Sequence, residues 1–177
     1  MASIGHVAVG LAARRWYTAD QTPRTPALVS MALWSGLSLL PDADVIAFVF
    51  RIPYAAPWGH RGATHSFAFA AFMGLLAYVT ARLLRLPAVR TGLLVAAVVA
   101  SHAVLDTLTD GGLGCALFWP FSNERYFAPW RPLPVAPIGA RFVSARGLRV
   151  AAIETCFFAV PLIYAFWPRR RKTAVRQ

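Results

Sequence analysis

Apolar segments separated by short stretches rich in Arg, Pro and Gly dominate the chain. Residues 2–17 predict a short helix, and residues 109–147 hold too much Gly, Pro and charge to cross a bilayer. A hydrocarbon core about 30 Å thick needs about 20 helical residues. We therefore predict an all-α fold, a polytopic helical membrane bundle of about four transmembrane spans plus the short N-terminal helix. The spans are expected at 27–40 (followed by a shorter apolar stretch at 45–50), 65–86, 88–108 and 148–167.

Composition favours the same class of protein. Hydrophobic residues make up 58% of the 177 residues and charged residues 14%, whereas soluble domains carry about 25% charged residues. So little polar surface cannot coat a water-soluble globule, and a lipid bilayer is the expected partner. We predict one helical membrane domain with a metal site over residues 1–168 and a basic cytoplasmic tail over 169–177.

The net charge of +11 comes largely from Arg clusters beside the apolar segments. Cytoplasmic loops of membrane proteins carry an excess of Arg and Lys. This rule predicts that Arg14, Arg15 and Arg24, the turn with Arg82, Arg85 and Arg90, and the tail 169–172 all face the cytoplasm. Membrane anchoring accounts for this charge, so no nucleic-acid partner is predicted. The 109–147 segment, expected outside, also carries Arg, and longer loops follow the rule less strictly.

The two cysteines, Cys115 and Cys156, do not form a Cys-x-x-Cys pair. Neither a disulfide framework nor a thiolate zinc site is therefore indicated. The first residues also lack the basic start and apolar run of a signal peptide. Insertion would rely on the later helices.

His102 and Asp106 lie inside a predicted span, where ionisable residues are costly and usually functional. Their spacing of four places both on one helix face. Imidazole and carboxylate together are normal ligands of zinc and related divalent ions. The alternative is a His–Asp hydrogen bond that tightens helix packing.

Asp42 and Asp44 follow the first predicted span directly. Two adjacent carboxylates in a low dielectric cannot both stay ionised without a cation or a proton. A metal resolves the conflict, with Asp42 as a ligand and Asp44 as a general base or additional ligand. The alternative is a solvated turn with an Asp cap.

The string His60-Arg61-Gly62-Ala63-Thr64-His65-Ser66 leads into the next predicted helix. His65 is expected to point into the bundle from the first helical turn. His60, on the loop, can bind metal or transfer protons, and Arg61 offers a planar fork for phosphate or carboxylate. The alternative is an interfacial loop whose His and Arg contact lipid headgroups.

The predicted topology places these groups at similar depth. At about 1.5 Å per residue, His102 lies roughly 18 Å above Arg90, and Asp106 about 24 Å. Asp42, His65 and Glu154 fall about 22–25 Å above the cytoplasmic ends of their own segments. His6 is the exception, because its short helix places it lower. Asp110 fits a ligand-supporting residue or a turn residue equally, and Arg125 a second anion contact or an ordinary loop position.

Several of these strings together resemble the YdjM-like family of bacterial membrane-bound, metal-dependent hydrolases. The similarity runs over roughly residues 1–127 plus the last span. It implies an inner-membrane location and hydrolase activity, with little about the substrate. The matching strings are Gly5-His6 with Gly10, Leu39-Leu40-Pro41-Asp42-Ala43-Asp44, His60 to Ser66, His102-Ala103-Val104-Leu105-Asp106 and Pro120-Phe121.

We therefore predict a metal-dependent hydrolase that acts on a phosphoester or lipid-like substrate at the non-cytoplasmic face. Zinc is the expected metal, and manganese and iron accept the same ligands. A metal or proton transporter and a structural membrane protein stapled by a metal are the rival hypotheses. The expected metal ligands are Asp42, His65, His102 and Asp106, with His6 as a weaker one, and the expected catalytic residues are Asp44, His60 and Arg61.

Overall fold

The computed structural model describes residues 3–18, 25–137 and 139–168. Within them the fold is helical and contains no strand; two isolated bridges, Thr109–Leu133 and Cys115–Tyr126, tie the loops together. The α-helices are α1 (Ser3–Tyr17), α2 (Ala27–Leu39), α3 (Phe67–Leu83), α4 (Ala88–Thr107), α5 (Ala145–Phe157) and α6 (Ala159–Phe166), and the 3-10 helices are η1 (Leu40–Phe48), η2 (Ala63–His65) and η3 (Gly139–Val143).

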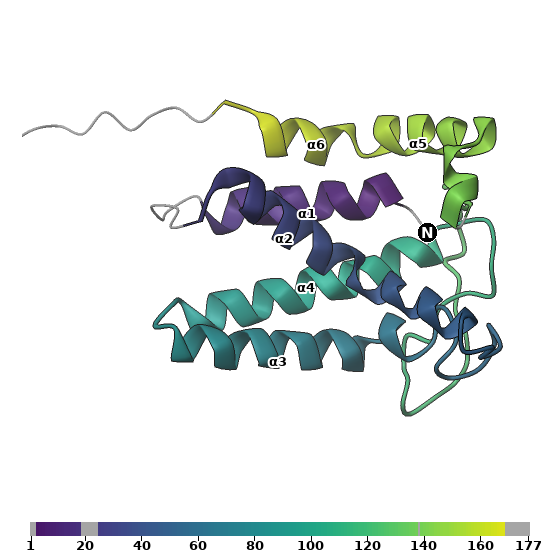
Figure 1. The fold of residues 1–177 in the computed structure, drawn as a ribbon, viewed down its shortest axis with the longest axis horizontal. Coiled ribbons are helices and arrows are strands. Elements are labelled where there is room, and N and C mark those ends of the chain that lie inside the picture. The colour runs from purple at the N-terminus through teal and green to yellow at the C-terminus, as the bar shows by residue number, and fades with distance from the viewer. Residues whose placement is uncertain (1–2, 19–24, 138, 169–177) are drawn as a thin grey trace, which may run out of the picture.

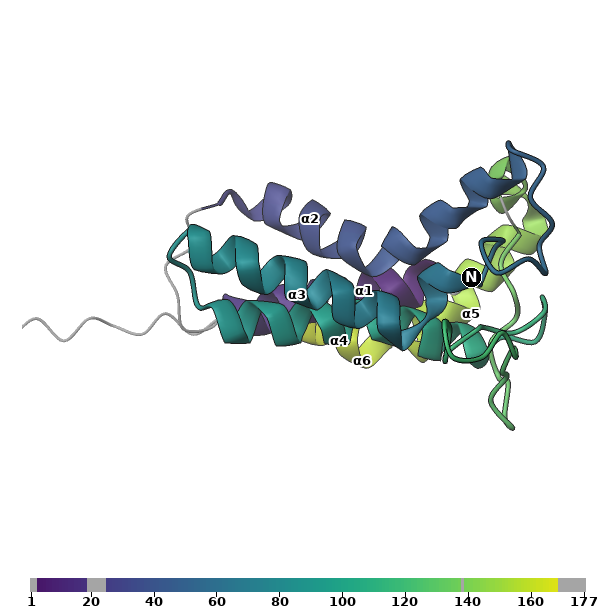
Figure 2. The ribbon, with the colours of Figure 1, turned by 90° about the horizontal axis from the view of Figure 1, so that it is seen from below.

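The helices lie side by side along one long axis (Figures 1 and 2). The α3–α4 hairpin makes the most extensive contact, α1 packs on α2 and α4, and α6 packs on α1. Glycine makes the hairpin contact close, because a Cβ on Gly92 would lie 2.8 Å from Tyr78 Cβ and 2.9 Å from the Gly74 carbonyl oxygen. The core between α1, α2, α3 and α4 is apolar and is built around Trp34, Val95, Val98 and Val99.

Fewer helices reach membrane-spanning length than the four predicted from the sequence. Within the described residues, Ala27–Phe48 and Ala88–Thr107 are long and apolar enough to cross a membrane. A third crossing requires α5 and α6 to act as one span, although they are bent by 71°. The remaining apolar helix, α3, has 17 residues. By length and composition alone, the described residues thus contain two or three candidate spans, fewer than the four predicted.

Two helix boundaries differ from the prediction. The first span does not halt at Pro41, because the chain continues as 3-10 helix η1, with Pro41 near its start, where a missing N–H is tolerated. The helix predicted at 65–86 begins later than His65. Ser66 has an extended backbone, and its Oγ accepts a hydrogen bond from Phe69 N (3.0 Å). Ser66 is thus the helix cap. His65 lies before the helix, not in its first turn.

Two of the three predicted basic clusters lie within the described residues, and both are at the same end of the bundle. The α3–α4 turn with Arg82 and Arg85 and the end of α1 with Arg14 and Arg15 are on the left of Figure 1. The loops between α4 and α5 lie at the opposite end. Arg24 and the predicted basic tail 169–177 fall outside the described residues.

Candidate metal centre

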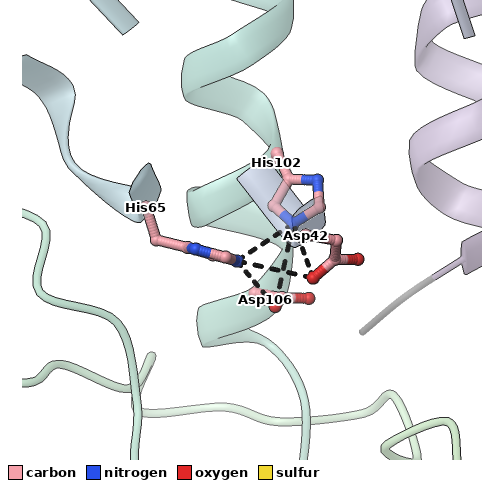
Figure 3. Close-up of side chains that lie close together, drawn as sticks. All are labelled: Asp42, His65, His102 and Asp106. Atoms are coloured by element: carbon pink, nitrogen blue, oxygen red, sulfur yellow. Dashed lines mark hydrogen bonds and ion pairs between the residues drawn. The ribbon is translucent and has the colours of Figure 1, made fainter. Parts of the chain in front are cut away.

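Four side chains from three segments converge inside the loop-rich half of the bundle (Figure 3). Asp42 comes from η1, His65 from η2, and His102 and Asp106 from successive turns of α4. One ligand atom from each lies within 4.8 Å of all the others, and all four residues are buried. The structure thus brings together the four residues chosen as the best ligands. We call them the metal cluster.

The separations within the metal cluster suit a divalent ion. His102 Nε2 lies 3.4 Å from Asp42 Oδ1 and 3.1 Å from His65 Nε2. His65 Nε2 lies 3.6 Å from both Asp42 Oδ1 and Asp106 Oδ2. Ligands at about 2.0–2.2 Å from a tetrahedral ion are separated by about 3.3–3.6 Å. The donor set, two imidazoles and two carboxylates, is also one that such ions accept.

The backbone of the first span orients His102. Its Nδ1 lies 2.7 Å from the Ser38 carbonyl oxygen. In the 3-10 register this carbonyl would bond to the N–H of residue 41, but Pro41 has none. Because a carbonyl can only accept, Nδ1 carries the proton. The lone pair of His102 Nε2 in the neutral ring therefore points into the metal cluster.

His65 is oriented in the same way by a carboxylate. Its Nδ1 lies 3.1 Å from Asp44 Oδ2, which accepts the proton. Both Nε2 atoms of the cluster then present lone pairs to each other at 3.1 Å. Such a contact is repulsive unless a proton or a metal ion lies between them. Metal-bound histidines usually donate the second ring N–H to a carboxylate or backbone carbonyl, as both do here.

Asp42 contributes the carboxylate with the fewest partners. Neither of its oxygens accepts a hydrogen bond from the residues that the structure describes. A buried carboxylate without donors is expensive, whereas a cation in the cluster would neutralise it. Asp106 is held differently, since Arg61 Nε lies 2.9 Å from its Oδ2.

His6 reaches the cluster, which corrects the predicted lower depth. Its ring stacks on His102 with centroids 3.7 Å apart, and its Nε2 lies 3.3 Å from Asp106 Oδ1. Arg90 donates to the Trp16 carbonyl (2.7 Å), so α1 and α4 are level there. From that level His6 rises about 15 Å and His102 about 18 Å. The helices are antiparallel and side chains lean toward helix N-termini, so the two rings lean toward each other.

Asp44 lies beside the metal cluster and joins it to His60. Its Oδ1 lies 2.6 Å from His60 Nδ1, and its Oδ2 accepts from Arg61 N (3.0 Å) and Thr64 Oγ1 (2.7 Å) as well as from His65. Four donors match the acceptor capacity of a carboxylate. Asp44, His60 and His65 also form a second group with metal-ligand spacing. The four bonds indicate that Asp44 orients the two histidines.

Arg61 is almost fully buried, with 1% of its surface exposed. Besides Asp106, its guanidinium donates to the Gly111 carbonyl (2.9 Å) and to Thr109 Oγ1 (3.1 Å). Gly112 permits this packing, because its φ is +88° and a Cβ there would lie 2.9 Å from Arg61 Nη1. Arg61 therefore holds the Asp106 carboxylate of the metal cluster in place. The sequence had suggested that Arg61 binds a phosphate or carboxylate group, without naming a carboxylate of the protein.

Three further polar residues have structural contacts. Arg125 donates to the carbonyl oxygens of Tyr54, Ala56 and His60, so the suggested role as a second anion contact is replaced by a clamp on the 54–60 loop. Asp110 Oδ1 accepts from Val135 N (2.7 Å), so Asp110 ties the end of α4 to a distant loop, a role that the sequence did not suggest. Glu154 Oε2 accepts from Ile4 N (2.7 Å) and so docks α5 on the start of α1.

Burial and charge set the electrostatics at this end. Burial lowers the pKa of a histidine, but at His65 the attraction of the neighbouring Asp106, Asp42 and Asp44 carboxylates outweighs burial and raises the pKa to about 10. These carboxylates thus attract positive charge. Burial raises the pKa of the Cys115 thiol to about 12. Cys115 and Cys156 are both free.

A pocket of about 820 Å³ lies beside His60 and Arg61, and the four residues of the metal cluster are not part of its lining. His60 and Arg61 form part of its lining, while their opposite contacts run to Asp44 and Asp106. Its remaining lining comes from Tyr54, Gly112, the 135–137 loop, η3 and the start of α5. We call it the outer pocket.

Sequence reasoning missed the residues that support the cluster. Ser38 acts through its carbonyl oxygen, which no side-chain pattern reveals. The Thr109 hydroxyl accepts a hydrogen bond from Arg61, and the sequence did not single this residue out. Thr64 stands inside the His-Arg-Gly-Ala-Thr-His-Ser string, and this position was the available signal.

Comparison with known proteins agrees with the resemblance seen in the sequence. The model of the YdjM inner membrane protein family matches residues 1–172. A relative from Escherichia coli (strain K12), inner membrane protein YbcI, is 39% identical over 140 residues, which cover 76% of this chain and 81% of that protein. No solved structure matches significantly.

Proposed function

The chain belongs to the YdjM inner membrane protein family, and we propose that it is a membrane-bound hydrolase that depends on a divalent metal. Its location is the bacterial inner membrane, with the apolar helices as spans. The activity rests on the metal cluster and the outer pocket. The hydrolase is thus a proposal about the site, since the family description names no reaction.

One observation supports a bound metal ion. Two imidazole Nε2 atoms, each with its other nitrogen already donating, face each other at 3.1 Å between two buried carboxylates. Without a metal, the proton that the raised pKa keeps on His65 lies between the two nitrogens, and a divalent ion would replace this proton and neutralise both carboxylates. Asp42, His65, His102 and Asp106 would hold it, with zinc first and manganese or iron as alternatives.

The protein supplies a proton acceptor beside this site. His60 donates from Nδ1 to Asp44, and its Nε2 has no hydrogen bond within the described residues. The ring contributes to the lining of the outer pocket. An imidazole oriented by a carboxylate is a common general base. When bound, the metal would lower the pKa of a water and polarise the scissile group.

The proposed topology places the site toward the non-cytoplasmic face. Basic residues at the α3–α4 turn and the end of α1 favour the cytoplasm, and the metal cluster lies toward the other end. In this topology α3 also crosses the membrane, because its 17 residues extend about 26 Å and it pairs with α4 along its length. The bent α5–α6 pair supplies the last crossing.

Metal content tests the first half of the proposal. Elemental analysis of the detergent-purified protein is expected to find a near-stoichiometric divalent metal. A His102→Ala/Asp106→Ala variant is expected to lose it. A Glu124→Ala variant is the control, since Glu124 is exposed and its hydrogen bonds among the described residues are to Ser122 and Tyr126 of its own loop. A metal-free parent after reconstitution with zinc, manganese and iron would refute the site.

Turnover tests the second half. We expect metal-loaded protein to cleave a phosphoester or lipid ester, and His60→Gln to lower kcat by about 10²–10⁴-fold, the usual contribution of a general base. The same variant is expected to keep its metal. If the parent retains its metal but cleaves nothing in a broad panel of esters and phosphoesters, the proposed hydrolase activity is refuted. The proposed metal centre would still stand.

A metal-stapled structural protein is the second candidate. It is favoured by burial, since His65, His102 and Asp106 are each 0% exposed. Structural zinc sites are closed, whereas catalytic sites keep a position open. In that case a chelator should unfold the bundle in parallel with metal loss, and no variant of His60 should affect any measurable property beyond stability.

A further inference from the structure

The outer pocket carries a net positive lining. Three arginines contribute to it, namely Arg61, Arg141 and Arg146, and no Asp or Glu is among the lining residues. The guanidinium groups of Arg141 and Arg146 make no hydrogen bond or ion pair with any residue that the structure describes. Arg61 is paired with Asp106, whereas Arg141 and Arg146 are exposed and have no acidic partner among the described residues. An anionic occupant of the pocket would give these two arginines a counterion.

Part of the pocket lining is apolar. Val135, Pro137 and Ala140 contribute to it, and the loops that lead from α4 to α5 lie at one end of the bundle (Figures 1 and 2). A volume of about 820 Å³ is in the usual range for small-molecule sites. It far exceeds the size of one phosphate group. A lining that combines charged and apolar side chains fits a ligand with both characters.

Two residues connect the outer pocket with the metal cluster. Arg61 lines the pocket and lies 2.9 Å from the Asp106 carboxylate, and His60 lines it and lies 2.6 Å from Asp44. A ligand in the pocket would therefore meet the proposed general base. Guanidinium groups are the side chains best suited to phosphate, because they donate two parallel hydrogen bonds.

We propose that the outer pocket binds the phosphate group of an anionic lipid headgroup, with Arg141 and Arg146 as its phosphate contacts. The inference rests on the proposed hydrolase only in assigning this ligand as substrate. The apolar part of the lining would take the glycerol and the first methylenes of the acyl chains. Phosphate binding itself requires neither turnover nor metal.

Binding to purified full-length protein in nanodiscs of neutral lipid tests the proposal. The probes are short-chain phosphatidic acid, the corresponding diacylglycerol and inorganic phosphate, each followed by isothermal calorimetry. We expect phosphatidic acid to bind at least tenfold more tightly than the other two. Arg141→Gln/Arg146→Gln should weaken phosphatidic acid at least tenfold. Arg131→Gln/Arg149→Gln, which removes two exposed charges outside the pocket lining, should leave its affinity unchanged.

Each other outcome is decisive. If both double variants bind phosphatidic acid with equal affinity, the pocket is refuted as its binding site. Nonspecific charge would then explain the affinity. Equal affinities for phosphate and phosphatidic acid, both lost in the pocket variant, would overturn the lipid headgroup in favour of free phosphate. Binding lost in the pocket variant without any cleavage by the metal-loaded parent would support the headgroup site and refute only the hydrolase. Cleavage of uncharged esters without phosphatidic acid binding would refute only the headgroup site.

Discussion

Replacing Asp44 by Asn should weaken metal binding although Asp44 lies outside the metal cluster. The carboxylate accepts four hydrogen bonds, among them the one from His65 Nδ1. An Asn amide keeps one acceptor oxygen and presents two donors in place of the other. About half of the four donors lose their acceptor, and His65 is no longer fixed with Nε2 toward the cluster.

The expected loss follows from the role of the second ring nitrogen. Removing the partner that orients a metal-bound histidine typically costs 10–100-fold in metal affinity. This is about 1.4–2.8 kcal/mol at 25 °C. We therefore expect Asp44→Asn to raise the zinc Kd by about 10–100-fold, with stoichiometry near that of the parent once zinc is in excess.

Competition against a chromophoric chelator in detergent measures this Kd. Asp110→Asn is the matched control, because within the described residues its side chain accepts one hydrogen bond, from Val135 N, which an amide oxygen accepts equally well. Thermal unfolding of both metal-free variants checks that the bundle remains folded. A Kd within twofold of the parent would refute the orienting role of Asp44. A loss above about 1000-fold with reduced stoichiometry would instead make Asp44 a ligand.

Three further predictions address the fold. Gly92→Ala should destabilise the α3–α4 contact by about 1–3 kcal/mol, while Gly36→Ala, which has no atom within 4 Å of the added Cβ, should be neutral or stabilising; comparable unfolding midpoints would contradict the close contact. In a Cys156→Ala background, Cys115 should resist maleimide until the pH approaches 12, because its raised pKa keeps the thiol protonated at lower pH; labelling of native protein at pH 8 would contradict this. Gly112→Ala should lower the free energy of unfolding by about 1–3 kcal/mol, because the φ of +88° at this position is strained for alanine. Thermal unfolding measures this loss, and an unchanged midpoint would show that the turn relaxes freely.

The metal cluster was predictable because its residues are conspicuous in an apolar chain. His102 and Asp106 stand four residues apart in a predicted span, where charged groups are expensive. Counting residues from the basic ends placed Asp42 and His65 at the same depth. Helical rise is fixed, so depth along a bundle can be estimated from the sequence.

The division of roles around the cluster was less predictable. Asp42 and Asp44 have identical side chains two residues apart, yet one faces the cluster and the other accepts four hydrogen bonds. The difference arises because η1 is a 3-10 helix with about three residues per turn, so residues two apart face different directions. The sequence suggested a turn at this point.

The sequence by itself determined that the helices lie in a lipid bilayer and which ligand-type side chains they carry. Apolar runs and basic ends require a helical membrane protein, and the His and Asp strings supply metal-ligand types at one level. Tertiary structure alone decided which partner each of these residues has. The Ser38 carbonyl, which Pro41 cannot engage, orients His102. Arg61 donates to the Asp106 carboxylate and to the Gly111 carbonyl. Such pairings depend on how helices cross and where loops return, and these are set by packing over the whole chain, not by local pattern.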